Sequence, residues 1–166
     1  MRVLTSFAVL SLCSIAAACA NAPASSTAEA NAGIDSLNAR IVNAYRRHDP
    51  QAYGRLYTDS AVFEWPAFNT VRGRAGMTAM ARDNWQALKG MDLALAVASR
   101  RIDGDHATEF GAFEQSWRDS SGARMAEFGR YVSVVGRQPD GRWLMEHFFG
   151  FEDSTRTLAA TVSKGR

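Results

Sequence analysis

His147 is the side chain of this sequence whose type and setting best suit proton transfer near neutral pH. An imidazole has a reference pKa of about 6.5, so it can act as a general acid or base. In a strand covering this region, alternation predicts one aromatic and apolar face with a single titratable member, made of Trp143, Met145, His147, Phe149 and Phe151. The alternative interpretation is a histidine held by a backbone carbonyl or at the edge of a sheet.

Two hydroxyl side chains could complete such a site. Tyr131 and Ser133 lie two residues apart on a predicted strand and therefore share a face, where Tyr131 could donate to a developing oxyanion. A hairpin that turns at Asp119–Gly122 would place Phe110 opposite Tyr131. A register shift of one residue would reverse these orientations. Ordinary core packing of both side chains is the alternative interpretation.

The same hairpin would bring Glu114 close to Glu127. Two carboxylates that face each other raise the pKa of one of them, as acid catalysis requires. We expect instead that both lie on the solvated face of the sheet, close to arginines such as Arg124 and Arg130.

The sequence contains no pattern typical of metal or phosphate binding. His48, His106 and His147 lie far apart in the chain, and no two of them have i, i+4 spacing. No glycine-rich phosphate motif follows a predicted strand. With 19 basic and 17 acidic residues the formal charge is +2, which argues against strong attraction to nucleic acid. We therefore expect no metal, no cofactor and no nucleic-acid partner.

Helices and strands that could position these side chains follow one another in two groups. A first helix carries an apolar stripe with helical spacing at Ile34, Leu37, Ile41 and Ala44. Asp49-Pro50 begins a short second helix, and a third spans the stripe from Met77 to Leu88. The predicted strands are 61–65, 93–102, 106–118, 124–136 and 143–151. Helices followed by hairpin-linked strands predict an α+β fold with three helices on one face of an antiparallel sheet.

The N-terminal residues have the pattern of an export signal. Met1-Arg2 is followed by an uncharged, mostly apolar run and then by small residues, as in a signal peptide of residues 1–19. Ala16-Ala17-Ala18-Cys19 resembles a bacterial lipobox, which implies lipidation of Cys19 and a lipid anchor as the sole membrane contact. Ordinary cleavage after Ala18 or Ala20 is the alternative, and the intact mass of the mature protein distinguishes the two. Either route predicts an exported bacterial protein, periplasmic or anchored to the envelope.

Composition divides the rest of the chain into three parts. Residues 20–31 are small and polar and are expected to form a flexible spacer, although Ser26 and Glu29 have the spacing of a capping box. Residues 32–155 form a single predicted domain, and 156–166 form a C-terminal tail.

Several short motifs, in this order and spacing, resemble the SnoaL-like domains of the nuclear transport factor 2 superfamily. The likeness covers roughly residues 32–153 and rests on Asp49-Pro50, Leu56-Tyr57-Thr58-Asp59-Ser60-Ala61-Val62, Arg72-Gly73-Arg74, Gly104-Asp105 and Gly129-Arg130-Tyr131-Val132. The resemblance implies a cone-shaped, cystatin-like domain, in which a curved antiparallel sheet wraps around helices and encloses a mostly apolar pocket.

Ketosteroid isomerase belongs to the same superfamily, but its catalytic groups have no counterpart in this sequence. Trp65 stands where its catalytic carboxylate would be, before the proline that ends the first strand. Ile41 lies near the position of its oxyanion-hole tyrosine, and Ser133 near that of its protonated aspartate. Neither Trp nor Ile can act as a base, so that catalytic arrangement is excluded here.

The resemblance and the residues together predict binding of a small, largely apolar organic molecule inside the cone. Cofactor-independent acid–base chemistry of the isomerase, dehydratase or cyclase type would then fall to His147 and Tyr131. The pocket lining is expected to include Phe63, Trp65, Met80, Phe110, Ser133 and Phe149. The alternative is a non-catalytic module that acts as a homodimer in ligand binding or protein interaction.

Overall fold

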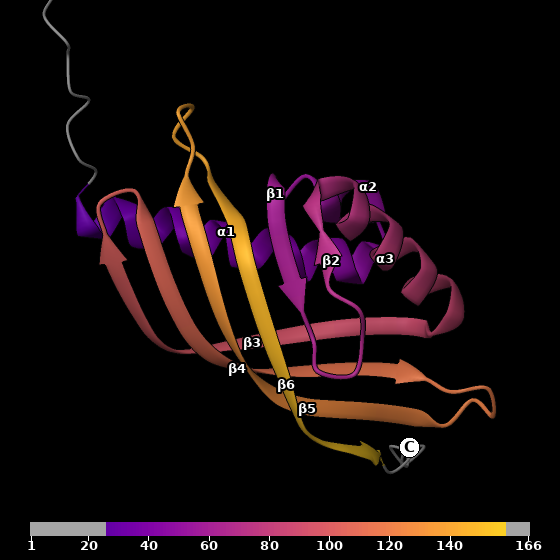
Figure 1. Cartoon of the computed structure of the whole chain (residues 1–166). Helices are drawn as coiled ribbons and strands as arrows, with labels where there is room; N and C mark the ends of the chain where they lie inside the picture. Colours follow the sequence, from indigo (N-terminus) through magenta and orange to yellow (C-terminus); the bar gives the residue numbers. More distant parts are fainter. Residues whose placement is uncertain (1–25, 159–166) are drawn as a thin grey trace, which may run out of the picture.

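The chain folds into a six-stranded sheet with three helices packed against one face (Figure 1). This computed structural model describes residues 26–158. The predicted signal peptide and Cys19 lie outside the described residues, as does the end of the predicted tail. None of the described helices is long and apolar enough to span a membrane.

Of the three helices, the first two begin at polar side-chain caps and the third has no such cap. They are α1 (Thr27–Arg47), α2 (Pro50–Gly54) and α3 (Gly73–Ala87). The Ser26 hydroxyl accepts a hydrogen bond from the Glu29 amide at 3.2 Å, and the Asp49 carboxylate accepts one from the Ala52 amide at 2.8 Å. Because α1 already begins at Thr27, the predicted spacer boundary at residue 31 is too late.

Most of the strands are longer than predicted, and one pairing is parallel. They are β1 (Tyr57–Glu64), β2 (Val71–Arg72), β3 (Lys89–Asp103), β4 (His106–Arg118), β5 (Arg124–Arg137) and β6 (Trp143–Thr157), in the order β2-β1-β6-β5-β4-β3. The α+β class and the placement of the helices on one face are confirmed. The sheet is mixed rather than purely antiparallel, because β1 runs parallel to β6. The two-residue strand β2 was not predicted.

The β4–β5 hairpin is shifted by one residue from the predicted register. Tyr131 pairs with Gly111, and Phe110 pairs with Val132. A five-residue connection causes the shift, because the Asp119 carboxylate accepts bonds from the amides two and four residues later. Phe110 therefore lies on the outer face with 49% of its surface exposed, and its predicted place in the pocket lining is wrong.

A bulge in β6 reverses the predicted orientation of His147. Val135 pairs with Met145 and Val134 pairs with His147, so Glu146 is an extra residue in this strand. Met145 and Phe148 consequently face the helices, whereas His147 and Phe149 face outward. The predicted row with His147 among inward-facing aromatic side chains is wrong for this reason.

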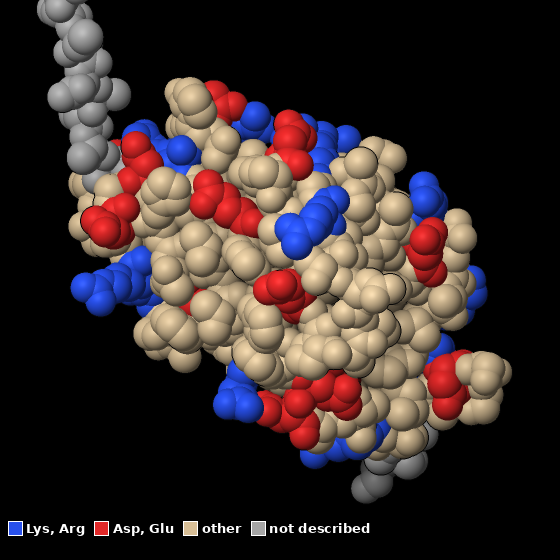
Figure 2. Space-filling model, in the orientation of Figure 1, with Lys and Arg blue, Asp and Glu red and all other residues tan. Residues whose placement is uncertain are grey.

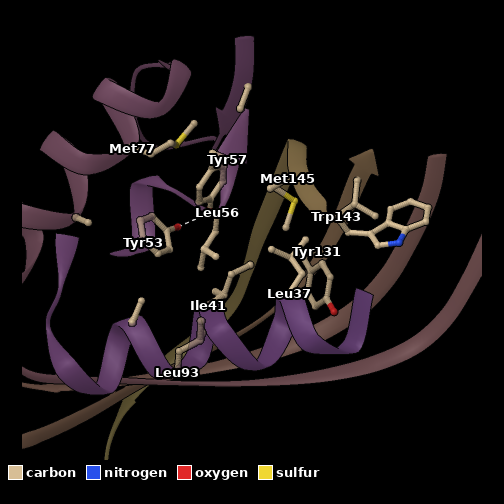
Figure 3. Close-up of a cluster of buried hydrophobic side chains, with 14 of the residues drawn as sticks. Leu37, Ile41, Tyr53, Leu56, Tyr57, Met77, Leu93, Tyr131, Trp143 and Met145 are labelled. Atoms are coloured by element: carbon tan, nitrogen blue, oxygen red, sulfur yellow. Dashed lines mark hydrogen bonds between the residues drawn. The ribbon is translucent and has the colours of Figure 1, made fainter. Parts of the chain in front are cut away.

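The core lies between α1 and the inner face of the sheet. Leu37 and Ile41 are fully or almost fully buried, and Figure 3 shows them extending from α1 toward Tyr131 and Met145. Close packing extends to the backbone, since a Cβ at Gly33 would lie 2.5 Å from Cδ1 of Trp143. On the face drawn in Figure 2, acidic and basic side chains are interspersed.

Candidate ligand-binding cavity

A cavity of about 340 Å³ lies between the helices and the inner face of the sheet. Its aromatic lining comes from α1, α2, the β1–β2 connection and four strands, and comprises Tyr45, Tyr53, Tyr57, Phe63, Trp65, Phe68, Phe113, Trp117, Tyr131 and Phe148. The cavity is therefore a hollow with apolar walls, within the volume range typical of small-molecule sites.

Four aromatic rings form a nearly parallel row along one wall. Trp65 and Phe63 have ring centroids 6.1 Å apart, Phe63 and Phe148 5.2 Å, and Phe148 and Tyr131 5.5 Å, with interplanar angles of 6°, 7° and 16°. The ring of Trp65 lies against Gly150, where no Cβ could be accommodated. Phe63, Phe148 and Tyr131 come from three adjacent strands and Trp65 directly follows the first of them, so the sheet fixes their spacing.

Half of the predicted pocket lining is correct. Phe63, Trp65 and Met80 line the cavity, and so does the predicted Tyr131. Phe110 and Phe149 face away from it, and Phe148 takes the place expected for Phe149. Ser133 is buried on the same face as Tyr131 but does not line the cavity.

His147 lies outside the cavity, on the outer side of the sheet. Its Nε2 is 3.0 Å from Oε2 of Glu64, and the two side chains are 44% and 35% exposed. Phe63 and Trp65 point inward on either side of Glu64 along the chain, as strand alternation requires. His147 therefore differs from the alternative interpretation as well, because its partner is a carboxylate rather than a backbone carbonyl and β6 is an interior strand of the sheet.

Tyr131 lies at the cavity wall, but its hydroxyl proton already forms a hydrogen bond within the protein. The hydroxyl donates to Oε1 of Glu109 at 2.7 Å, and Asn38 Nδ2 donates to the same oxygen at 2.9 Å. Burial, reinforced by the Glu109 carboxylate, raises the pKa of Tyr131 well above its ordinary value. Tyr131 therefore offers a ligand a hydrogen-bond acceptor and not the donor expected for an oxyanion.

Glu109 is held in a buried ion pair behind this wall. It is 1% exposed, and its Oε2 accepts bonds from Nε and Nη2 of Arg100 at 2.8 and 2.6 Å. The same guanidinium donates to Asp35 at 2.7 Å and to the side-chain oxygen of Asn31 at 2.9 Å. The arginine thus fixes a carboxylate that in turn orients two cavity side chains, Asn38 and Tyr131.

Three tyrosines form a second polar cluster at the helical side. The hydroxyls of Tyr53 and Tyr57 are hydrogen-bonded to each other, as the dashed line in Figure 3 marks. Tyr45 packs edge-on against Tyr53, with ring centroids 5.5 Å apart. Burial raises the pKa of all three hydroxyls, which therefore stay protonated and can serve only as neutral hydrogen-bonding groups.

Glu127 is the acidic side chain of the cavity wall. It lies opposite Gln115 in the β4–β5 ladder, and both side chains line the cavity. Its Oε1 is buried without a hydrogen-bond partner in the described part of the chain. Burial, reinforced by the nearby charge of Glu152, raises the pKa of Glu127 from 4.5 to about 7. Such a carboxyl can exchange a proton with a bound molecule or pair with a ligand cation.

Sequence reasoning missed Glu127 and Glu109 as site residues, although strand alternation offered a signal for Glu127. Glu127, Tyr131 and Ser133 lie at even spacing on one strand and hence on one face, yet Glu127 was expected in solvent. Glu114 is exposed as expected and does not pair with Glu127. The inward position of Glu109 could be predicted only from the correct β4 register, which the Asp119 turn controls.

The described residues also bear on metal binding. Residues 26–158 contain no group of three or more His, Cys, Asp or Glu side chains that could hold a metal ion. The polar groups of the cavity are amides, tyrosine hydroxyls and one carboxyl.

Comparison with known proteins identifies a family model and many solved structures. The model of the SnoaL-like domain matches residues 26–148. No curated protein matches the sequence.

Three of the solved structures illustrate the likeness. A ketosteroid isomerase-like protein from Erwinia carotovora atroseptica is 18% identical, with a TM-score of 0.66 over 74% of this chain and 95% of that chain. A protein with a cystatin-like fold, similar to nuclear transport factor 2, from Novosphingobium aromaticivorans is 22% identical, with a TM-score of 0.66 over 76% and 84%. A type 3 hexachlorocyclohexane dehydrochlorinase from Novosphingobium barchaimii is 15% identical, with a TM-score of 0.68 over 79% and 91%. At these identities the likeness establishes the fold.

The Glu109–Arg100 pair makes a testable contribution to stability. Replacing Glu109 by Gln leaves the Arg100 guanidinium, whose side chain is 9% exposed, without its buried counter-charge. We expect a loss on the order of 3 kcal/mol in the free energy of unfolding measured with urea. Asp35→Asn is the matched control, because Asp35 binds the same guanidinium from a position that is 67% exposed; this change should cost less than about 1 kcal/mol. Equal losses in the two variants would contradict the assignment.

The raised pKa of Glu127 predicts that replacing this residue changes the free energy of unfolding by an amount that depends on pH. The folded state keeps the Glu127 proton to a higher pH than the unfolded chain, so stability falls as the pH rises from about 4.5 to about 7. Glu127→Gln should therefore be more stable than the wild type at pH 8, on the order of 1–2 kcal/mol after solvent screening is allowed for. The difference should shrink toward pH 4 in urea titrations. Glu114→Gln, at an exposed position on the same sheet, is the control; a Glu127→Gln difference independent of pH would count against the assignment.

Proposed function

Because the chain belongs to the family of SnoaL-like domains, we propose that it binds a small, largely apolar organic molecule in the cavity. The observation that carries this proposal is the hollow of about 340 Å³ with its wall of aligned aromatic rings. Trp65 and Met80, which could have filled the hollow, line it instead, and Trp85 packs against Tyr45 and Tyr53. Burial of an apolar ligand surface against these rings supplies the main driving force.

The polar groups of the cavity support a ligand with a polar end. Asn38, Asn84 and Gln115 line the wall together with Glu127 and the tyrosine hydroxyls. A few polar groups in an apolar hollow orient a ligand, whereas the apolar surface supplies most of its affinity. The proposed ligand is therefore a mostly apolar molecule with one polar end.

Acid–base chemistry in this cavity would fall to Glu127 rather than to His147. His147 lies on the outer face, bonded to Glu64, and the Tyr131 proton is committed to Glu109. Glu127 has a pKa of about 7 because burial disfavours its charge, which suits a general acid or base near neutral pH. A hexachlorocyclohexane dehydrochlorinase shares this fold, and removal of hydrogen chloride from a substrate includes proton transfer.

We also propose that the protein acts outside the cytoplasm, because residues 1–19 have the pattern of a signal peptide.

A homodimer is the second candidate, favoured by an apolar cluster on the outer face of the sheet. Phe110, Val132 and Phe149 align across β4, β5 and β6, and Phe151, which is 40% exposed, packs against Phe149. Beside the cluster, the exposed Arg130 and Asp153 pair at 2.8 Å. A second copy related by a two-fold axis can cover the cluster and exchange these charges, since each copy supplies both signs.

The cavity proposal is tested with propylbenzene as an apolar probe. The wild type should bind it saturably at one site in calorimetric titration. Leu95→Trp should weaken binding at least about tenfold, because Leu95 lines the hollow and the larger side chain fills it. Val97→Trp is the control on the same strand, at a position that is 44% exposed and outside the lining. Absence of saturable binding to the wild type would reject the cavity as a ligand site.

The dimer proposal is tested by the molar mass in solution. Light scattering should give twice the chain mass for the wild type and the monomer mass for Phe110→Glu, because a buried carboxylate destabilises an apolar interface. Phe68→Glu is the control, since Phe68 is 71% exposed at the cavity and away from the outer cluster. A monomeric wild type at the highest concentrations tested would contradict this candidate.

A further inference from the structure

The Glu127 carboxyl belongs to the cavity wall, and one of its oxygens has no hydrogen-bond partner among the described residues. Its Oε1 is buried and lacks a hydrogen-bond partner within residues 26–158. Gln115, its partner across the β4–β5 ladder, lines the same cavity, but no hydrogen bond joins the two side chains. An unpaired buried carboxylate destabilises the protein without ligand, so a ligand that donates a hydrogen bond to it binds more tightly.

The charges around Glu127 are negative or already paired. Glu152 on β6 adds a second negative charge, and Tyr45 on α1 is neutral. Among the described residues that line the cavity there is no Lys, Arg or His. Arg100 is held by Glu109 and Asp35, and no ion pair joins Glu127 to any described residue. The interior therefore has a net negative potential when Glu127 is ionised.

The aromatic wall adds an attraction for positive charge. The faces of Trp, Tyr and Phe rings carry the negative part of the ring quadrupole, and a cation within about 6 Å of a ring centroid is stabilised. Phe113, Trp117 and Tyr131 line the same cavity as Glu127 and come from β4 and β5, the two strands that carry Gln115 and Glu127. A carboxylate and several aromatic rings thus line one hollow.

From this arrangement we propose that the ligand is an organic ammonium ion, whose charged nitrogen binds at Glu127 and whose apolar body contacts the aromatic wall. The inference rests on the proposed binding function and specifies the ligand class for that cavity. A neutral hydroxyl group could donate to the carboxylate but would leave its charge uncompensated, whereas an ammonium supplies a donor and the counter-charge together. The same negative potential would repel an anionic ligand.

Binding of an ammonium ion should change the protonation of Glu127. An ammonium at Glu127 stabilises the carboxylate form, so ligand binding lowers the pKa of this group and releases protons near pH 7. Affinity for an ammonium should accordingly rise as the pH increases from 6 to 8, provided that the amine itself stays protonated. Propylbenzene should show no such rise.

Three probes of nearly equal shape separate the contributions. These are 2-phenylethylamine as the ammonium, 2-phenylethanol as the neutral donor and propylbenzene as the apolar reference. At pH 8 we expect the wild type to bind the amine at least about tenfold more tightly than either neutral probe in calorimetric titration. Glu127→Gln should remove this preference while its affinity for propylbenzene stays within about threefold of the wild type, which also shows that the variant is folded. Glu152→Gln, the control at an exposed carboxylate, should keep most of the preference.

The outcomes distinguish this inference from the proposed function on which it rests. Binding of propylbenzene without preference for the amine would overturn the ammonium assignment and leave the cavity proposal intact. Equal affinity for the alcohol and the amine, or an amine preference that survives in Glu127→Gln, would also overturn it. Failure of all three probes to bind the wild type would reject both.

Discussion

The pairing of β5 with its two neighbours determines what the cavity contains. On one side the Asp119 turn fixes the β4 register, which turns Phe110 outward and places Glu109 behind Tyr131. On the other side the extra residue Glu146 lets Met145 and Phe148 both face inward while His147 faces solvent. Since side chains alternate along a strand, a shift of one residue in either pairing would exchange the chemistry of the inner and outer faces.

Two carboxylates of the inner face illustrate how surroundings decide the role of identical groups. Glu109 is fully buried and paired with Arg100, so it serves as a fixed acceptor that orients Tyr131 and Asn38. Glu127 has no cationic partner in the described structure and keeps one buried oxygen free of hydrogen bonds. Burial without compensation raises its pKa to about 7. The first carboxylate is therefore part of the scaffold, and the second is available to a ligand.

Local patterns in the sequence were sufficient to predict the helices and most strands. The apolar stripe of α1 and the Asp49-Pro50 start of α2 depend on neighbouring residues only, and both are correct. The parallel β1–β6 pairing and the two-residue strand β2 depend on contacts between distant segments, which local patterns do not contain.

The site was predicted less completely because it depends on single-residue register. Phe63, Trp65 and Tyr131 line the cavity, and their orientation follows from alternation along their own segments of the chain. His147 was misplaced because a bulge leaves no simple signature in the sequence. Glu127 could have been found, since it shares its strand face with Tyr131, but its charge suggested solvent exposure. A partly buried carboxylate without a charge partner departs from the usual pattern, in which charged side chains are exposed or paired. Such departures tend to mark functional sites.

The proposed ligand lies in the apolar hollow with its polar end at Glu127. The most direct test is a crystal structure of the protein with 2-(4-bromophenyl)ethylamine, in which anomalous scattering locates the bromine without ambiguity. We expect the bromine beside the aromatic row formed by Phe63, Trp65, Tyr131 and Phe148, with the amine nitrogen within hydrogen-bond distance of Glu127. Bromine found only on the outer face of the sheet, or an inner face collapsed so that no hollow remains, would contradict the account.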